Sequence, residues 1–116
     1  MTVAVVIVNW NGKRMLQRFL PEIVLHSKEA SIYVIDNNSS DDSIAFIKNE
    51  FPNVKRVVNP DNLGYAGGYN LGLKGIKEDI LCLINNDVRV TKNWLPPIID
   101  FFKSNPNTQA AQPHIL

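Results

Sequence analysis

Cysteine is almost absent from the sequence. Cys82 is the only cysteine among 116 residues, which excludes a disulfide within the chain and a zinc site built from several cysteines. Cys82 lies inside an apolar run, so we expect it to be a small core residue. His26 and His114 are the only histidines, and neither has a neighbouring pattern of metal ligands or catalytic partners.

An excess of charge of one sign is also lacking. The 12 Lys and Arg residues are balanced by 11 Asp and Glu residues, the formal net charge is +1, and no long basic block occurs. The chain therefore offers no basic field to the backbone of a nucleic acid, and we expect no nucleic-acid partner.

Long hydrophobic runs are missing as well. The apolar stretch at residues 3–8 has no basic leader and is far too short for a signal sequence or a membrane span. We expect a cytoplasmic chain without a transmembrane segment. With 45% hydrophobic and 20% charged residues, the composition is typical of one soluble globular domain.

The sequence does contain short apolar runs that alternate with longer segments. Strands buried on both faces are predicted at "VAVVIV" (3–8), "SIYVID" (31–36), "VKRVV" (54–58) and "ILCLI" (80–84). Helices are predicted at residues 12–27, 39–51, 67–77 and 91–104. We expect the first helix to be kinked or restarted at Pro21. The second should have Asp41 and Asp42 in its first turn, and the last should have its two prolines in its first turn. This alternation predicts an α/β fold with an open, mainly parallel sheet flanked by helices.

Polar residues follow each predicted strand. Asn9, Trp10 and Asn11 follow the first strand, and residues 36–41, 59–64 and 85–88 follow the others. Any one of these endings is more often an ordinary turn than a site. Because ligands of open parallel sheets bind beyond the carboxyl ends of the strands, where the strand order reverses, the four endings together predict a binding rim.

Two carboxylates belong to this rim. Asp36 and Asp87 end strands that we expect to lie near each other. A carboxylate at a buried edge needs a hydrogen-bonding ligand or a cation, and carboxylate and amide oxygens suit Mg²⁺ or Mn²⁺. The rim therefore predicts a site for a divalent metal ion.

The segment "NLGYAGGYNLG" (62–72) is rich in glycine but fits neither GxxxxGK[ST] nor GxGxxG after a strand. Two interpretations remain open for it. Its glycines allow a helix to pack closely on the sheet, or they let a diphosphate reach backbone amides at a helix N-terminus.

Together these motifs resemble the nucleotide-binding half of glycosyltransferase family 2, whose members are inverting enzymes of GT-A fold. "VAVVIVNWN" is similar to the opening strand and loop, and "YVIDNNSSDDS" to the strand that ends in Asp-x-x-Ser. "NLGYAGGYNLGL" is similar to the glycine-rich stretch of the family, and "LCLINNDVRV" to the strand that ends in its DXD metal motif. The four motifs occur in the family's order and cover essentially the whole chain.

The resemblance implies transfer of a sugar from a nucleotide-diphosphate sugar to an acceptor hydroxyl, in the biosynthesis of a glycan such as a cell-envelope polysaccharide. Asp87 would ligate Mg²⁺ or Mn²⁺, with Asn85 directed toward the ribose or the metal. The rim and the resemblance together nominate these nucleotide-binding residues: Val8, Asn9, Trp10, Asn11, Asp36, Asn38, Asn62, Gly64, Gly67, Asn70, Asn85 and Asn86.

The sequence departs from the family pattern at two points. Asn85 stands where the family has its first Asp, which removes one formal charge, predicts weaker metal binding and leaves metal dependence open. The acceptor-binding half, with the carboxylate that acts as general base, is expected after residue 116. We therefore expect residues 1–116 to be the donor-binding part alone. The residues that bind a glycan or lipid-linked acceptor, and any peripheral attachment to the inner face of a membrane, would belong to a longer protein.

Two other functions remain open. A non-catalytic α/β module would use Asp36 and Asp87 as an acidic pocket for Mg²⁺ alone. A nucleotidyltransferase would bind nucleotide and metal at the same rim, but it would normally need basic residues in the phosphate loop, and residues 62–72 contain none.

Overall fold

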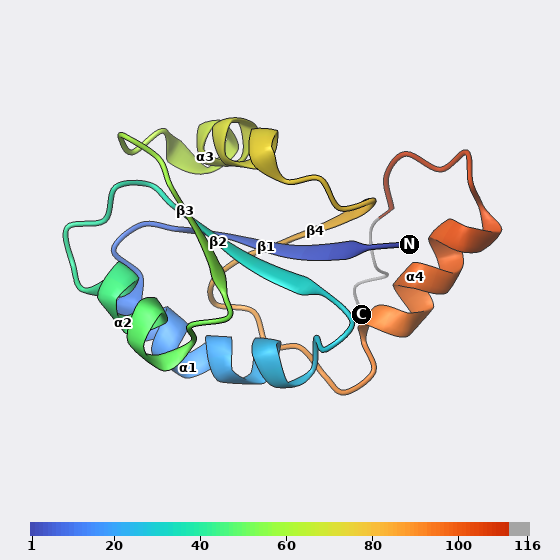
Figure 1. Ribbon diagram of the computed structural model, residues 1–116, viewed down its shortest axis with the longest axis horizontal. Helices are drawn as coiled ribbons and strands as arrows, with labels where there is room; N and C mark the ends of the chain where they lie inside the picture. Colours follow the sequence, from blue (N-terminus) through green and yellow to red (C-terminus); the bar gives the residue numbers. More distant parts are fainter. Residues whose placement is uncertain (112–116) are drawn as a thin grey trace.

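The computed structural model describes residues 1–111. Its elements follow one another in the order β1 (Val3–Asn9), α1 (Lys13–Leu25), β2 (Ser31–Asp36), α2 (Ser43–Glu50), β3 (Lys55–Val58), α3 (Gly64–Gly72), the 3₁₀ turn η1 (Leu73–Gly75), β4 (Ile80–Ile84) and α4 (Leu95–Ser104) (Figure 1).

The strands form a four-stranded parallel sheet in the order β3-β2-β1-β4. In this register Asn9 lies opposite Asp36 on one side of β1, and Ile7 lies opposite Ile84 on the other side. The strand order therefore reverses between β1 and β4, which is the point where open parallel sheets bind ligands. The predicted α/β class and open parallel sheet are confirmed.

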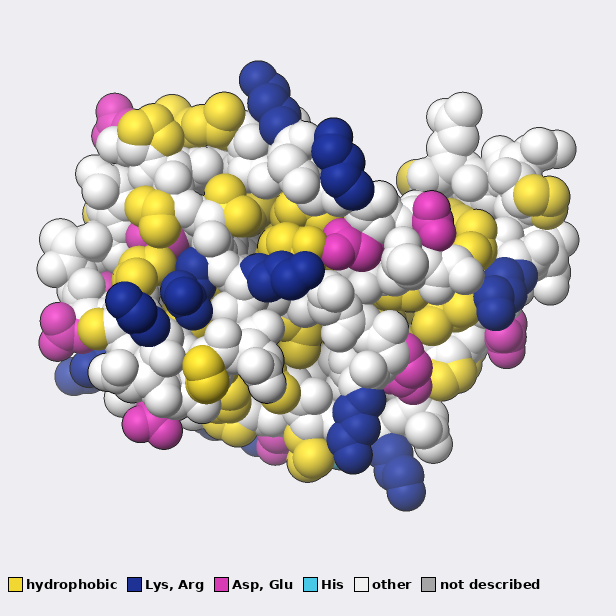
Figure 2. All heavy atoms as spheres, viewed as in Figure 1, with side chains coloured by type: hydrophobic (Ala, Val, Ile, Leu, Met, Phe, Trp, Pro, Cys, Tyr) yellow, Lys and Arg dark blue, Asp and Glu magenta, His cyan; other side chains and the backbone are white. Residues whose placement is uncertain are grey.

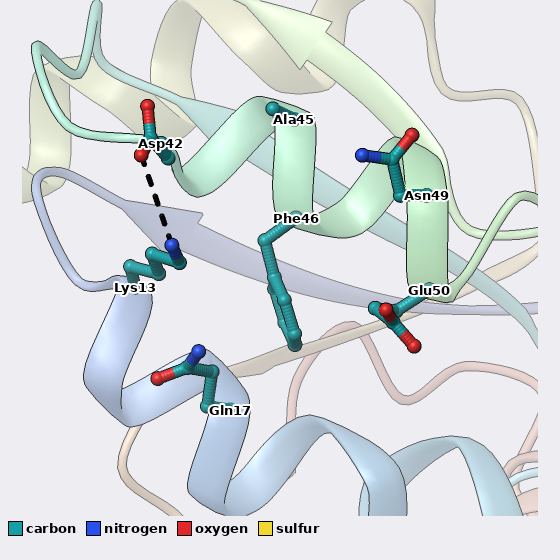
Figure 3. Close-up of a pocket in the computed structure, with 7 residues that line it drawn as sticks. All are labelled: Lys13, Gln17, Asp42, Ala45, Phe46, Asn49 and Glu50. Atoms are coloured by element: carbon teal, nitrogen blue, oxygen red, sulfur yellow. Dashed lines mark ion pairs between the residues drawn. The ribbon is translucent and has the colours of Figure 1, made fainter.

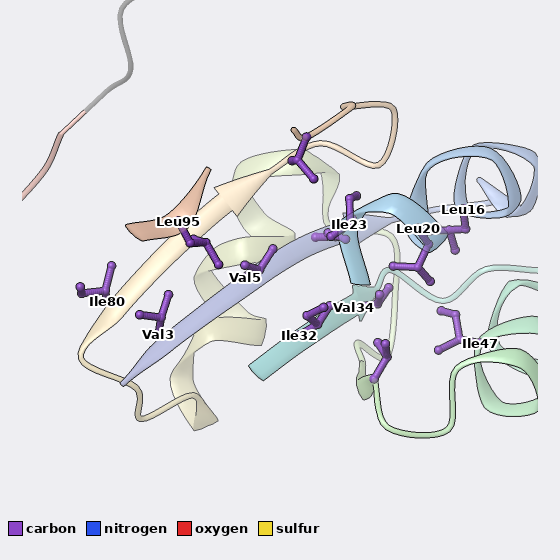
Figure 4. Packing of buried hydrophobic residues seen from close by; sticks show 13 residues of the cluster. Val3, Val5, Leu16, Leu20, Ile23, Ile32, Val34, Ile47, Ile80 and Leu95 are labelled. Atoms are coloured by element: carbon purple, nitrogen blue, oxygen red, sulfur yellow. The ribbon is translucent and has the colours of Figure 1, made fainter. Parts of the chain in front are cut away.

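Helices cover both faces of the sheet, as Figure 1 shows, with α1 and α2 on one face and α3 on the other. Side chains of β1 alternate between two cores, which explains its unbroken apolar sequence. The core under α1, α2 and α4 (Figure 4) consists of Val3, Val5, Ile7, Leu16, Leu20, Ile23, Ile32, Val34, Ile47, Val54, Ile80, Val90 and Leu95. The core under α3 consists of Ala4, Val6, Val8, Ile35, Tyr69 and Ile76.

The outer strands differ from the prediction that all four would be buried on both faces. Most of β3 is exposed because it is one edge of the sheet. In β4, Leu81 and Leu83 lie opposite Ala4 and Val6, on the face that carries α3, yet they are 38% and 48% exposed. The physical reason is coverage, because the apolar side chains that pack in the core under α3 come from β1, β2 and β3, and Leu81 and Leu83 stay outside this core.

Three helix predictions also need correction. The first helix, α1, is continuous through Pro21, so the restart that was one of the two alternatives predicted there does not occur. The second, α2, begins at Ser43, so Asp41 and Asp42 precede it and do not occupy its first turn. The third, α3, begins at Gly64 and not at residue 67, because the glycine-rich segment itself forms the helix.

The C-terminal predictions are confirmed only in part. Residues 91–94 lie outside α4, but the prolines Pro96 and Pro97 occupy its first turn as expected. Residues 109–111 form no strand, and residues 112–116, with His114, lie outside the described residues. Over residues 1–111, no helix combines the length and apolar character that crossing a membrane requires.

Candidate functional site

The carboxyl ends of β1, β2 and β4 meet at one rim, and Asn9 is at its centre. Asn9 is fully buried, and its Nδ2 donates hydrogen bonds to Asp36 Oδ1 at 3.0 Å and to Ser39 Oγ at 3.4 Å. Asn86 Nδ2, from the loop after β4, donates to Asn9 Oδ1 at 3.1 Å. A continuous hydrogen-bonded chain therefore runs from the β4 loop across β1 to β2.

Asp36 is a second internal residue of this chain. It is 1% exposed, its Oδ2 accepts from the Ser39 backbone N–H at 2.7 Å, and its Oδ1 accepts from Ser39 Oγ at 2.7 Å. These bonds, with that from Asn9, offset the desolvation of the carboxylate without a cation. The strands that precede these two carboxylates, β2 for Asp36 and β4 for Asp87, are not adjacent, because β1 lies between them.

Gly12 is a residue of the rim that the sequence interpretation missed. A Cβ atom at this position would lie 2.3 Å from Asn86 Nδ2 and 2.4 Å from Asn9 Oδ1, which are the two atoms of the Asn86–Asn9 hydrogen bond. With the two asparagines in these positions, there is no room for a side chain at residue 12. The available signal was the Asn-Gly pair in "NWNG", which follows β1.

Two of the four glycines of α3, Gly68 and Gly72, pack the helix closely on the sheet and the residue that follows β2. A Cβ atom at Gly68 would lie 2.6 Å from Asn37 Nδ2, and one at Gly72 would lie 2.5 Å from Ile35 Cδ1. Buried Asn37 also donates to the Gly64 carbonyl at 2.9 Å. Of the two interpretations of this segment, close packing explains Gly68 and Gly72, which were not nominated as ligand contacts.

The nominated residues of this segment are exposed or half-buried at the protein surface. Gly64 has φ +72° and open space around its Cβ position, and Gly67 is half-buried against Leu63. Asn62 Oδ1 accepts from the Gly64 backbone N–H at 3.1 Å and so forms the turn into α3. Asn70 is exposed.

Among the other nominated residues, some point outward and others hold the loops together. Trp10 is 52% exposed, and Asn38 is exposed with φ 60°. Asn11, with φ 49°, uses its Oδ1 to accept from the backbone N–H groups of Ser40 and Asp41, at 2.7 and 3.1 Å. Val8 is 8% exposed and belongs to the core under α3.

Two tyrosines of α3 contact the end of β4. The Tyr69 hydroxyl donates to the Ile84 carbonyl oxygen at 2.9 Å, and it also lies 3.3 Å from the Val6 carbonyl oxygen. Burial, together with the neighbouring Tyr65, raises the pKa of Tyr69 above its ordinary value, so its hydroxyl stays a proton donor. Tyr65 donates to Asn85 Oδ1. This contact was not predicted, because the two residues are far apart in the sequence.

Asp87 is exposed at the same rim, where its carboxylate is a candidate ligand of a divalent ion. No group of three or more His, Cys, Asp and Glu side chains that could enclose a metal occurs within residues 1–111. Mg²⁺ usually binds through one or two carboxylates, with substrate phosphates and water completing the shell. A single exposed carboxylate therefore fits an ion that arrives with a phosphorylated ligand.

A separate surface groove of about 540 Å³ lies between α1 and α2 (Figure 3). An ion pair of 3.8 Å joins Lys13 and Asp42 at one end, and Phe46 points toward α1 between the helices. None of the nominated residues lines this groove. On the face that Figure 2 shows, Lys and Arg side chains lie among acidic and apolar ones.

Comparisons with known proteins agree with the fold. Residues 4–115 match the family described as Glycosyl transferase family 2. S. aureus TarS residues 1–349 superpose with a TM-score of 0.78 at 17% identity, over 97% of this chain and 39% of that one. The mannosyltransferase PcManGT from Pyrobaculum calidifontis, in complex with GDP-Man and Mn²⁺, superposes with a TM-score of 0.64 at 17% identity, over 75% of this chain and 28% of that one.

A curated relative is N-acetylgalactosaminyltransferase 4 of Drosophila melanogaster, which is 26% identical over 98 residues. That alignment covers 79% of this chain and 14% of the relative. The chain therefore spans less than half of the length of each of these three proteins.

Proposed function

Because the chain belongs to glycosyl transferase family 2, we propose that it forms the nucleotide-sugar site of an inverting glycosyltransferase. The proposal depends above all on one observation. The Asn86–Asn9–Asp36 chain ties together the ends of three strands at the switch point of the sheet. Trp10, Asn38 and Asp87 are exposed along the same rim.

Each part of the rim has a proposed role toward the donor. Trp10 offers an aromatic face for a base, and Asn38 offers amide groups for the nucleoside. Asp36 and Asn9 hold the rim in shape from beneath, since their polar atoms already bond to protein groups. The exposed N-terminal turn of α3, with Gly64 and Gly67, would lie along the diphosphate and sugar.

The proposed reaction is attack by an acceptor hydroxyl on the anomeric carbon, with inversion. The bond from that carbon to the diphosphate oxygen breaks, and the nucleoside diphosphate leaves with the bond's electron pair. A divalent ion held by Asp87 would supply electrostatic stabilisation of this leaving group. The general base that takes the hydroxyl proton, and the glycan or lipid-linked acceptor, are proposed to belong to a part of the protein beyond residue 116.

The relatives support the chemical class of the donor. TarS has been crystallised with UDP and with UDP-GlcNAc, and PcManGT with GDP-Man and Mn²⁺. These complexes concern those proteins, and they make UDP and GDP with Mn²⁺ or Mg²⁺ the first ligands to test on this chain.

Nucleotide titration with and without metal tests the proposal. Calorimetry with UDP, GDP and dTDP should show binding that Mn²⁺ strengthens, and amide NMR with Mg²⁺ should place the shifts at the rim. Asp87→Ala should remove the metal-dependent part of the affinity, about tenfold or more, because it removes the carboxylate proposed to hold the ion.

Asp100→Ala, which changes an exposed carboxylate on α4, is the matched control and should bind like the unaltered chain. Unchanged Mn²⁺-dependent affinity in Asp87→Ala would contradict the metal assignment. Binding of Mg²⁺ alone, with no effect of any nucleotide, would favour a metal-binding module instead.

A further inference from the structure

We infer that Tyr65 is a positioning residue for Asn85 and turns position 85 into a hydrogen-bond donor toward the bound nucleotide. The inference deepens the proposed function and rests on it. Asn85 stands at the first position of the segment that resembles the DXD metal motif, and either its side-chain oxygen or its amide nitrogen could face the ligand. The contact with Tyr65 decides between them.

Helix α3 holds Tyr65 in place through its neighbour Tyr69. The two residues are one helical turn apart, so they lie on the same side of α3. Their rings meet edge to face, with centroids 5.0 Å apart and an interplanar angle of 80°. Tyr69 is 5% exposed and is anchored by its hydrogen bond to the Ile84 carbonyl. Although Tyr65 is itself 55% exposed, it packs on a fixed ring.

The same helix therefore contacts two consecutive residues of β4 and its loop. The Tyr69 hydroxyl bonds to the backbone of Ile84, and the Tyr65 hydroxyl donates to Oδ1 of Asn85. This second bond orients the carboxamide and occupies its oxygen. Within residues 1–111, no protein acceptor is bonded to the Asn85 amide nitrogen, which leaves its N–H groups for a ligand.

The chemistry of the rim then separates into two roles. Amide N–H groups suit ribose hydroxyl and phosphate oxygens, which accept hydrogen bonds, and they do not coordinate a cation. A divalent ion is left to Asp87 and to the phosphates it bridges. Asn85 thus offers the nucleotide a neutral hydrogen-bond donor at the position where the family resemblance implies a carboxylate. The hydrogen bond from Tyr65 gives the Asn85 side chain the orientation that this role requires.

The contact itself is tested first, without any nucleotide. Side-chain amide NMR signals of Asn85, assigned through Asn85→Ala, should shift in Tyr65→Phe toward those of a solvent-exposed carboxamide. Tyr33→Phe is the control, because that hydroxyl bonds to Glu78 Oε1 at 2.6 Å and takes no part in the rim. Asn85 signals that stay unchanged in Tyr65→Phe would overturn the inference.

A double-mutant cycle then tests the role toward the ligand. Affinity for UDP and GDP with Mn²⁺ is measured for the unaltered chain, Tyr65→Phe, Asn85→Ala and the double variant. Tyr65→Phe should weaken binding about five- to tenfold, and should have no further effect once Asn85 is alanine. Additive losses would overturn the inference, because Tyr65 would then contact the nucleotide itself.

The two failures can be told apart. If the unaltered chain binds neither UDP nor GDP while the Asn85 signals still respond to Tyr65→Phe, the proposed function is overturned, and the ligand-directed role of Asn85 with it. If nucleotide binds and Tyr65→Phe binds it with unchanged affinity, only the positioning role is overturned.

Discussion

At the scale of single residues, Gly12 leaves room for the hydrogen bond between Asn86 and Asn9, two residues that are far apart in the sequence. Gly12→Ala should break the Asn86–Asn9 hydrogen bond, because the new Cβ would overlap both of its atoms. The expected loss is about 1–3 kcal/mol of unfolding free energy, from one partly buried hydrogen bond and local overpacking. Urea unfolding followed by circular dichroism measures it.

Gly75→Ala is the matched control for this substitution, since a Cβ at Gly75 would meet nothing within 4 Å. Its stability should change by less than about 0.5 kcal/mol. Equal stability of Gly12→Ala and Gly75→Ala would mean that the two asparagines rearrange without cost, contrary to the rim described above.

Asp36 illustrates how burial changes the interpretation of a predicted ligand. Asp36→Ala should cost about 2–4 kcal/mol of unfolding free energy, because it leaves the buried Asn9 amide and the Ser39 groups without their acceptor. Thermal and urea unfolding give the loss. A fully stable Asp36→Ala that binds nucleotide more weakly would instead show direct contact between Asp36 and the ligand.

At the scale of elements, the loop between β2 and α2 is held by Asp41. Partial burial by itself raises the pKa of Asp41, but hydrogen bonds from the Ser43 hydroxyl and N–H and from the Lys13 N–H outweigh it and hold the pKa below its ordinary value. A carboxyl with a lowered folded-state pKa stabilises the fold above its unfolded pKa, about 3.9, and loses this contribution as the pH falls through the folded pKa.

Asp41→Asn should therefore be less stable than the unaltered chain at pH 7, by less than about 1 kcal/mol because the carboxylate is exposed and solvent screens it. The difference should shrink below about pH 4 and disappear once Asp41 is protonated in both states. Urea unfolding between pH 3 and pH 7 measures it. A difference that is independent of pH would mean that the charge of Asp41 contributes nothing.

At the scale of the whole molecule, the sheet is covered unevenly. Leu20 is fully buried between α1 and the sheet, whereas Leu83 on β4 is 48% exposed. Leu20→Ala should cost about 2–5 kcal/mol through lost burial and the cavity left behind, and Leu83→Ala less than about 1 kcal/mol. Unfolding free energies of this pair measure the difference. A comparable loss at Leu83 would show that a further surface covers β4 in solution.

The arrangement of the whole sheet also limited how much of the site could be predicted from the sequence. The apolar runs and polar strand ends indicated the parallel sheet and its rim, since both depend on local patterns of a few residues. The strand order was not available from such patterns, so the sequence did not show that β1 lies between the strands that precede Asp36 and Asp87. The exposure of Leu81 and Leu83 was missed for the same reason.

By itself, the sequence determined the alternation of strands and helices, the family, and the residues that follow each strand, because these are properties of neighbouring positions and ordered motifs. Only the tertiary structure decided which of those residues face inward. Asn9 became an internal bridge, Gly12 a required gap, and Tyr65 a partner of Asn85. These roles arise from contacts between residues far apart in the chain, and packing of the elements creates such contacts where no local pattern encodes them.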